Sequence, residues 1–223
     1  MTESEAKFEA YCSVNAIPYT RIAVGEDKTP DYEIILEDQR TVVEIKEIRL
    51  NDDEIKVKRR MDETGFASWG ISKFGERIRY KIDRCKRQLE TMTAKQYPGM
   101  LILYDTRPQP LCGISPTEIA VAMYGALTIE FRLPKEMGKP LVFERELFGE
   151  GKKLRYDTHN YISALAVLHE QGIENTLHLD IYHNIYASRP LPLDRLVKRK
   201  DMTLFTIDGR KADQFQNWQR ITE

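Results

Sequence analysis

Hydrophobic and polar positions alternate along the first half of the chain in ways that predict both helices and strands. Thr2 and Glu5 have the spacing of a capping box, and apolar residues then recur at one-turn intervals, which predicts a helix. Two β-branched runs joined by a polar turn predict an antiparallel hairpin. The expected elements are helices over residues 3–14 and 76–91, strands over residues 17–24, 34–36, 41–48 and 99–104, and a long loop, partly helical at most, over residues 51–75.

The second half favours strands. Ser115 is expected to cap a short helix that runs to about Tyr124, and the end of the chain around Trp218 is expected to pack back on the core. Further strands are expected over residues 127–133, 141–148, 162–168 and 177–182. We therefore expect one α/β domain over residues 1–223, in which residues 107–223 add a mainly β extension to a core formed by residues 1–106.

Charged residues interrupt the second strand of the predicted hairpin. Because side chains alternate along a strand, Glu44 and Lys46 share one face with Val42 and Ile48. If both faces are covered, these charges are partly desolvated, which is costly unless they are paired or bind a metal. Asp31, at the mouth of the adjoining strand, can supply a second carboxylate to the same place.

Two carboxylates and a backbone carbonyl make a hard oxygen site. With the carbonyl of Ile45, the carboxylates of Asp31 and Glu44 suit Mg²⁺ or Mn²⁺ and leave positions for water and a substrate phosphate. Lys46 can then orient or activate the attacking water, which is what phosphodiester cleavage needs. The alternative is an edge hairpin whose Glu44 and Lys46 form a surface ion pair.

The pieces Pro30-Asp31 and Glu44-Ile45-Lys46, separated by a short hairpin, resemble the motif of the PD-(D/E)XK superfamily of restriction-endonuclease-like nucleases. The resemblance covers about the first half of the chain, where the predicted order α-β-β-β-α-β matches that core. It implies an α/β fold with a central mixed sheet flanked by helices, extended here by additional C-terminal strands. It also implies Asp31, Glu44 and Lys46 as the catalytic residues of a Mg²⁺-dependent nuclease.

The same resemblance implies that the helix before the hairpin brings an acidic residue toward the metal. Glu5 is best placed for this, and Glu9, one turn on, is the second choice. The alternative for each is a solvated acid near the start of the helix, where a negative charge is favourable to the helix dipole.

Basic residues gather in two places next to the expected site. One edge of the helix over residues 76–91 carries polar residues at helical spacing, and in the resembled fold this helix flanks the active site. A second group lies in residues 51–75, close to Phe66 and Trp69, where a nucleic-acid strand could stack. The candidate nucleic-acid contacts are Arg77, Lys81, Arg84 and Gln88 on the helix, and Lys58, Arg59 and Arg60 in the second group. The alternative for both groups is a solvated surface without a ligand.

Composition narrows the class of protein. The 223 residues carry 34 basic and 35 acidic side chains, a net charge of −1, so any nucleic-acid surface must be local. Three cysteines without close spacing argue against a disulfide framework or a thiolate metal site and fit the reducing cytoplasm. The acidic N-terminus does not resemble a signal peptide, and no apolar run reaches the roughly 20 residues that span a membrane.

The sequence thus predicts a metal-dependent nuclease that acts on nucleic acid, DNA in preference to RNA. Two alternatives stay open: a catalytically inactive nucleic-acid-binding module of the same fold, and a protein-interaction domain in which the motif is coincidental. Cutting both strands of a duplex would favour a homodimer.

Overall fold

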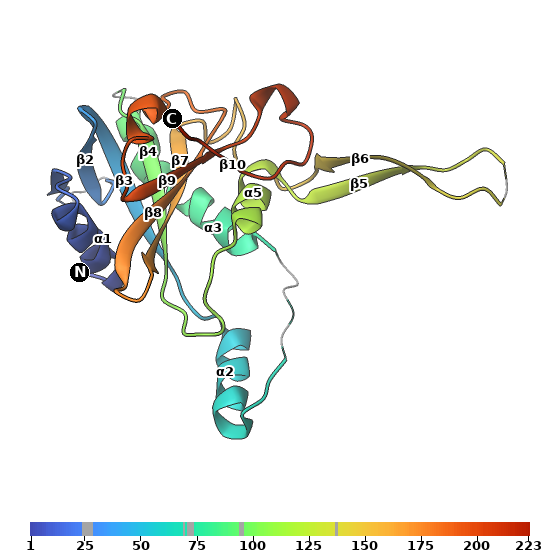
Figure 1. Cartoon of the computed structure of the whole chain (residues 1–223), viewed down its shortest axis with the longest axis horizontal. Coiled ribbons are helices and arrows are strands. Elements are labelled where there is room, and N and C mark those ends of the chain that lie inside the picture. Colours follow the sequence, from blue (N-terminus) through green and yellow to red (C-terminus); the bar gives the residue numbers. More distant parts are fainter. Residues whose placement is uncertain (24–28, 69, 71–73, 94–95, 137) are drawn as a thin grey trace.

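A large mixed sheet with helices on both faces forms the centre of the computed structural model, which describes residues 1–23, 29–68, 70, 74–93, 96–136 and 138–223 (Figure 1). Its strand order is β1-β2-β3-β4-β7-β8-β9-β10, so strands from both halves of the chain share one sheet. The strands are β1 (Tyr19–Arg21), β2 (Tyr32–Leu36), β3 (Gln39–Ile48), β4 (Gly99–Asp105), β7 (Ile162–Gln171), β8 (Thr176–His183), β9 (Met202–Thr206) and β10 (Gln219–Arg220).

The remaining elements are six helices, a 3₁₀ turn and a separate two-stranded sheet within the described residues. The helices are α1 (Glu3–Val14), α2 (Asp52–Thr64), α3 (Glu76–Arg84), α4 (Lys86–Thr93), α5 (Pro116–Tyr124) and α6 (Leu193–Leu196), and the 3₁₀ turn is η1 (Gly209–Lys211). The separate sheet pairs β5 (Leu127–Arg132) with β6 (Val142–Phe148), and this hairpin projects from the body as an arm (Figure 1). No described helix is long and apolar enough to cross a membrane.

The centre of the sheet is parallel. β3 pairs in parallel with β4, and β4 with β7, whereas β1, β2 and β3 form an antiparallel meander. Parallel neighbours need a crossover, and α2, α3 and α4 lie between β3 and β4 in the chain. Residues 99–104 of β4 are all buried, as expected for a continuous apolar run covered on both faces.

The predicted hairpin is present, with a tighter turn than expected. Leu36 pairs with Gln39, so only Glu37 and Asp38 form the turn, and both have positive φ angles, of 46° and 65°. Two left-handed residues match the right-handed twist of the flanking strands, which lets β3 begin at Gln39.

Each face of β3 belongs to a different hydrophobic core. Val43 and Ile45 pack in a cluster with Phe8 and Tyr11 of α1, and Val42 and Ile48 pack in the other cluster. That second cluster takes its helical residues from α3, α4 and α5, including Ile78, Ile82, Leu89 and Ile119. The predicted alternation along this strand is therefore confirmed, and both faces of the strand are covered.

Residues 52–64 correct the sequence prediction, since they form helix α2 and not a loop. The helix is capped at both ends: Asn51 and Glu54 form a capping box, and Gly65 ends it in the left-handed conformation. None of its residues is buried, so the apolar stripe that normally reveals a helix is missing. The predicted helix over residues 76–91 is likewise divided at Cys85 into α3 and α4.

The other predicted helices and strands agree more closely with the structure. The first strand keeps only residues 19–21 of the predicted 17–24, and residues 24–28 lie outside the described part of the chain. The strands expected at 127–133 and 141–148 are present, but they pair with each other away from the large sheet. Trp218 packs on the rings of Tyr124 and Tyr182 and donates a hydrogen bond to the Pro116 carbonyl at 2.8 Å, which confirms that the chain end packs back.

A buried hydroxyl joins the central strands to the loop before α6. The Ser163 Oγ atom accepts a hydrogen bond from the Gly99 N–H at 3.0 Å and donates one to the Arg189 carbonyl. Ser163→Ala should lower the free energy of unfolding by about 1–3 kcal/mol, because it leaves a buried N–H and a carbonyl without their partner. Urea denaturation measures this. Ser188→Ala, which removes an exposed hydroxyl bonded to Asn160, is the control and should change stability by less than about 0.5 kcal/mol.

Candidate functional site

The carboxylate of Asp31 is fixed just before β2 begins, beside the part of β3 that extends past the hairpin. The first β2 residue, Tyr32, pairs with Val43, so the Ile45 N–H of β3, which points to the same side, has no strand partner there. Asp31 Oδ2 accepts this hydrogen bond from the Ile45 N–H at 2.8 Å. A residue in a strand presents its N–H and C=O to the same side, so the Ile45 carbonyl lies on the Asp31 side of β3.

Glu44, the β3 residue before Ile45, points into the core covered by α3 and α4, close enough to Asp31 for the two charges to interact. The residue is only 1% exposed. One carboxylate oxygen, Oε1, accepts a hydrogen bond from Lys46 Nζ, while Oε2 is buried without a hydrogen-bond partner within the described structure. Burying a charged carboxylate oxygen without a partner costs free energy, and a proton or a cation on this atom would lower that cost.

The electrostatics of the two carboxylates agree with this interpretation. Burial, and after it the negative charge of Asp31, raise the pKa of Glu44 to about 7 against the opposing effect of Lys46. Burial also raises the pKa of Asp31, against the hydrogen bond from Ile45. Without a cation, Glu44 is therefore near half-protonation at neutral pH, and a divalent ion would favour its charged form.

These groups border an open cleft of about 470 Å³ between the start of α1, the end of β3 and the exposed side of α3. Asp31, Ile45 and Lys46 lie on its floor, and Arg77 and Lys81 come from α3. The full lining consists of Thr2, Ser4, Glu5, Asp31, Ile45, Lys46, Glu47, Arg49, Arg77, Tyr80 and Lys81. The cleft thus brings Asp31, Ile45 and Lys46 together with two of the predicted basic residues. Glu44 does not line the cleft itself and reaches it through its ion pair with Lys46.

Both acidic candidates from α1 already hold partners. Glu5 lines the cleft, but its Oε1 accepts from Arg21 at 2.8 Å and its Oε2 accepts from the Thr2 N–H at 2.6 Å in the capping box. Glu9 accepts the hydroxyl hydrogen of Tyr32 at 2.7 Å. The structure therefore brings Glu5 to the site and shows it serving the start of the helix.

The sequence interpretation missed Glu47 and Arg49, which also line the cleft. Burial raises the pKa of Glu47, but hydrogen bonds from the Ser4 N–H and Arg49 outweigh it and leave the pKa lowered. Strand alternation assigns Glu47 to the face opposite Lys46, which is why the pattern did not suggest it. Its place beside the cleft comes from the approach of α1, which sequence spacing does not reveal.

The donor set suits a hard cation that keeps several waters. Among the described residues, no three or more histidine, cysteine, aspartate or glutamate side chains form a group that could hold a metal ion. Two carboxylates and the Ile45 carbonyl could supply three oxygens, and Oε2 of Glu44 has no hydrogen-bond partner in the described structure. Mg²⁺ is commonly held by one or two carboxylates plus waters and substrate phosphate, so the residues fit it.

Four basic side chains line the cleft among its three carboxylates. Burial lowers the pKa of Lys81, and the nearby charges of Lys46, Arg49 and Arg77 lower it further. Arg77 forms an ion pair with Glu54 at 2.9 Å, which links the start of α2 to the cleft wall. A lysine whose pKa is lowered by neighbouring cations marks a place where a bound anion would be stabilised.

The other basic candidates lie outside the cleft. Arg84 lies over the Tyr80 ring at 5.2 Å, and Gln88, on α4 beyond the break at Cys85, has a buried Oε1. Lys58, Arg59 and Arg60 lie on the exposed helix α2, where Lys58 pairs with Asp62. Of the two aromatic residues expected beside them, Phe66 is exposed and Trp69 lies outside the described residues.

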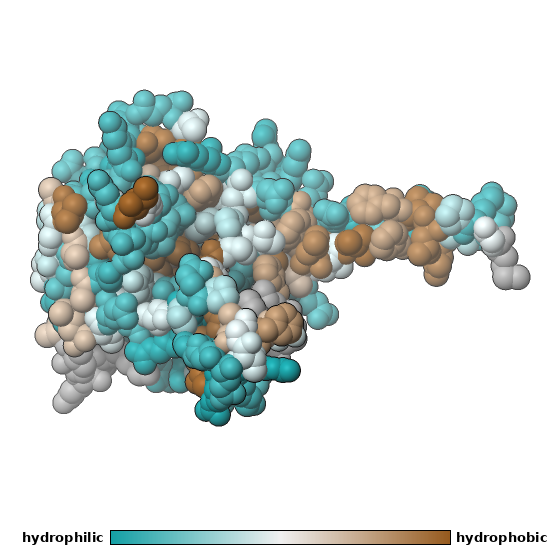
Figure 2. Space-filling model, turned by 60° about the horizontal axis from the view of Figure 1, so that its bottom comes forward, coloured by the Kyte–Doolittle hydropathy of each residue, from teal (hydrophilic) through white to brown (hydrophobic). Residues whose placement is uncertain are grey.

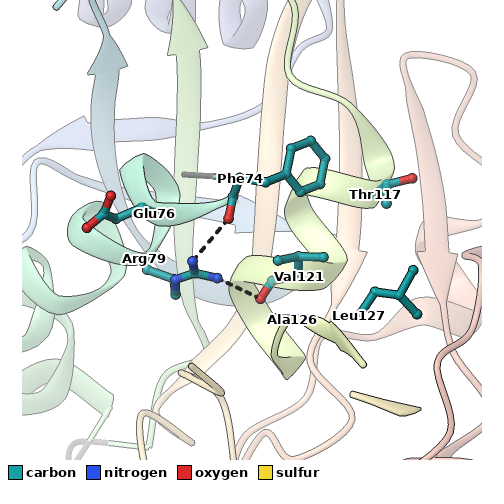
Figure 3. Close-up of a pocket in the computed structure, with 7 residues that line it drawn as sticks. All are labelled: Phe74, Glu76, Arg79, Thr117, Val121, Ala126 and Leu127. Atoms are coloured by element: carbon teal, nitrogen blue, oxygen red, sulfur yellow. Dashed lines mark hydrogen bonds between the residues drawn. The ribbon is translucent and has the colours of Figure 1, made fainter. Parts of the chain in front are cut away.

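A second, larger pocket of about 630 Å³ lies at the base of the β5–β6 arm (Figure 3). It is mainly apolar and lined by Phe74, Glu76, Arg79, Thr117, Val121, Ala126 and Leu127. Arg79 donates hydrogen bonds to the Val121 carbonyl at 3.2 Å and the Phe74 carbonyl at 3.0 Å. This pocket lacks the arrangement of carboxylates and lysine found at the end of β3.

The raised pKa of Glu44 makes stability depend on pH. The folded-state pKa of about 7 exceeds the ordinary 4.5, so in chelator the native protein loses stability as pH rises from about 4.5 and levels off above about 7. The total is on the order of 3 kcal/mol. In Glu44→Gln this loss should be absent, so the free energy of unfolding of the variant should rise relative to that of the wild type as pH rises. Urea denaturation from pH 4 to 9 measures both.

The same experiment tests the cation. Mg²⁺ or Mn²⁺ at pH 8 should stabilise the wild type and leave Glu44→Gln unchanged, because binding to the folded state adds to its stability. Glu33→Gln, which removes a β2 carboxylate paired with Arg40, is the control and should behave as the wild type. Parallel pH profiles for wild type and Glu44→Gln would contradict the burial argument.

Comparison with known proteins gives no relative. No protein-family model matches the chain, and neither a curated protein nor a solved structure matches it. A function can therefore be inferred only from the cleft at the end of β3 and from the motif residues beside it.

Proposed function

We propose that this chain is a metal-dependent nuclease with a restriction-endonuclease-like core, which hydrolyses phosphodiester bonds of nucleic acid, DNA in preference to RNA. The observation that carries the proposal is the buried Glu44 carboxylate with its unpartnered oxygen, beside Asp31 and Lys46. A surface ion pair, the alternative for Glu44 and Lys46, would not leave the carboxylate 1% exposed.

Asp31, Glu44 and the Ile45 carbonyl would hold Mg²⁺ or Mn²⁺. When bound, the ion supplies polarisation of a phosphate oxygen and a water of lowered pKa. Lys46 is held by Glu44 with its side chain in the cleft, so its ammonium can position the attacking water. Arg49, which also lines the cleft, presents a mostly exposed guanidinium to an incoming phosphate.

The element order supports a restriction-endonuclease-like core. α1 precedes the meander β1-β2-β3, helices follow, and β4 returns in parallel beside β3, which gives α-β-β-β-α-β. Strands β7 to β10 then extend the sheet beyond β4. In this arrangement the motif strand β3 lies next to the buried strand β4, and α3, the second helix after β3, forms one wall of the cleft.

A nucleic-acid-binding module that does not cleave is the second candidate. It is favoured by α2, an exposed helix with a basic run away from the cleft, where Lys58, Arg59 and Arg60 could contact phosphates without any metal. Cleavage assays on labelled DNA and RNA, with Mg²⁺, Mn²⁺ or chelator, separate the two candidates.

Asp31→Asn and Glu44→Gln should abolish divalent-dependent cleavage, and Lys46→Ala should lower kcat by about 10²–10⁴-fold. Substrate affinity of the Lys46 variant should stay within a few-fold of wild type, because an interaction made only in the transition state appears in kcat. Single-turnover assays and binding titrations give both quantities. Lys7→Ala, which removes an exposed α1 lysine paired with Glu170, is the control. Full activity of either carboxylate variant would refute the metal assignment.

The cleft cations should set the salt dependence of binding. Arg49→Gln with Lys81→Gln should reduce the slope of log K against log salt by about 1–2, since each phosphate contact contributes roughly 0.9. Lys198→Gln with Lys200→Gln removes two exposed charges beside β9, four strands or about 19 Å from β3, and should leave the slope unchanged. Fluorescence anisotropy at several salt concentrations measures the slope, and equal slopes for both pairs would remove the cleft from the binding surface.

A further inference from the structure

One face of the β5–β6 arm carries a strip of apolar side chains, which is interrupted by Glu146, the cross-strand partner of Ile129. Residues opposite each other in an antiparallel pair share a face, and Phe131 pairs with Phe143, with ring centroids 6.1 Å apart. Phe131 and Phe143 are 54% and 55% exposed, and Leu133 near the tip is 79% exposed. The strip consists of Leu127, Ile129, Phe131, Leu133, Leu141 and Phe143, and Figure 2 shows hydrophobic side chains along the projecting arm.

The other face of the arm carries charges that neutralise one another. Glu130 pairs with Arg145 at 2.7 Å, and Arg132 pairs with Glu144 at 2.6 Å. Residues 127–148 contain four basic and four acidic side chains, so the arm has no net charge. A neutral ribbon does not attract a phosphate backbone, and two copies of it do not repel each other.

The described structure covers this strip only at the base of the arm. There Phe215 packs on Phe148, and the backbone of residues 213–215 bonds to β6. Farther out, the two strands have only each other, and a two-stranded hairpin is marginally stable alone in water. A large exposed apolar strip on such an element indicates an interface.

The size of the strip matches half of a stable protein interface. Large side chains present roughly 150–250 Å² each when fully exposed, so these six, together about half exposed, present on the order of 700 Å². A standard interface buries about 800 Å² on each partner. Two such strips in contact would therefore bury about the area that a stable dimer needs.

The arm also carries a receiving surface for such a strip. Leu127 belongs both to the strip and to the apolar pocket at the base of the arm, where Phe74 and Val121 lie around the same opening (Figure 3). A two-fold interface requires one patch to be complementary to itself, with projecting and receiving parts on each copy. Exposed leucines near the tip and an apolar pocket at the base meet that requirement.

We propose that this chain forms a two-fold dimer through the β5–β6 arms, in which each arm lays its apolar strip on the base of the partner's arm. The leucines near each tip, Leu133 and Leu141, seat at the partner's pocket lined by Phe74, Val121 and Leu127. The partner is a second copy of this chain, because the strip and its receiving pocket are adjacent on one molecule.

Sedimentation equilibrium of the full chain tests the dimer. The wild type should be dimeric at about 100 µM, and Phe131→Ser with Phe143→Ser should weaken the dimer by roughly 100-fold or more, since aromatic anchors dominate interfaces. Glu130→Ser with Arg145→Ser removes a charge pair from the opposite face and should leave the association within about three-fold. Urea midpoints close to wild type show that the variants remain folded.

A cross-link tests the placement of the arm. In a Cys112→Ser background, mixing Leu133→Cys chains with Thr117→Cys chains under mild oxidation should give a disulfide-linked pair containing one of each, because Thr117 is an exposed residue at the rim of the pocket. A monomeric wild type at about 100 µM, or a dimer that the Phe131 and Phe143 substitutions leave intact, overturns the proposal. A dimer without the mixed cross-link overturns the seating at the pocket.

Discussion

The burial of one carboxylate in strand β3 is the constraint on which the arrangement of the cleft depends. Glu44 is taken out of water by the same two-sided packing that gives the sheet its core, and its charged form is correspondingly disfavoured. Lys46 compensates part of that cost from two residues along the strand, on the same face. The rest of the cost falls on Oε2, which has no hydrogen-bond partner in the described structure.

The geometry around this carboxylate follows from where β2 begins. Had β2 begun before Tyr32, its backbone would have accepted the hydrogen bond from the Ile45 N–H, and Asp31 would have had no fixed position beside β3. The start of β2 at Tyr32 therefore has two effects. It anchors the second carboxylate with a backbone hydrogen bond, and it opens the edge of β3 to the cleft between α1 and α3. The same opening is bordered by Arg49 and Lys81, so the cleft that lowers the pKa of a lysine is also the one suited to a polyanion.

Sequence reasoning reached the hairpin because its signals are local. Alternation placed Glu44 and Lys46 on one face with Val42 and Ile48, and the two cores of the sheet confirm that. It failed at α2, where a capping box and a left-handed Gly65 outweigh the missing apolar stripe, and it extended one helix across Cys85 to Gln88, whose oxygen is buried. Glu47 and the pocket role of Leu127 depend on contacts between elements far apart in the chain, which no spacing rule contains.

The two hairpins of this fold break the ordinary burial pattern in opposite ways. The β2–β3 hairpin buries a charge, and the β5–β6 arm exposes several apolar side chains together. Such places are candidates for contacts outside the chain. A bound cation would lower the free-energy cost of a desolvated carboxylate. A second apolar surface would lower the cost of exposed phenylalanines and leucines. The arm carries no net charge and exposes a largely apolar face, so the partner that its chemistry suits is a second apolar surface and not a polyanion.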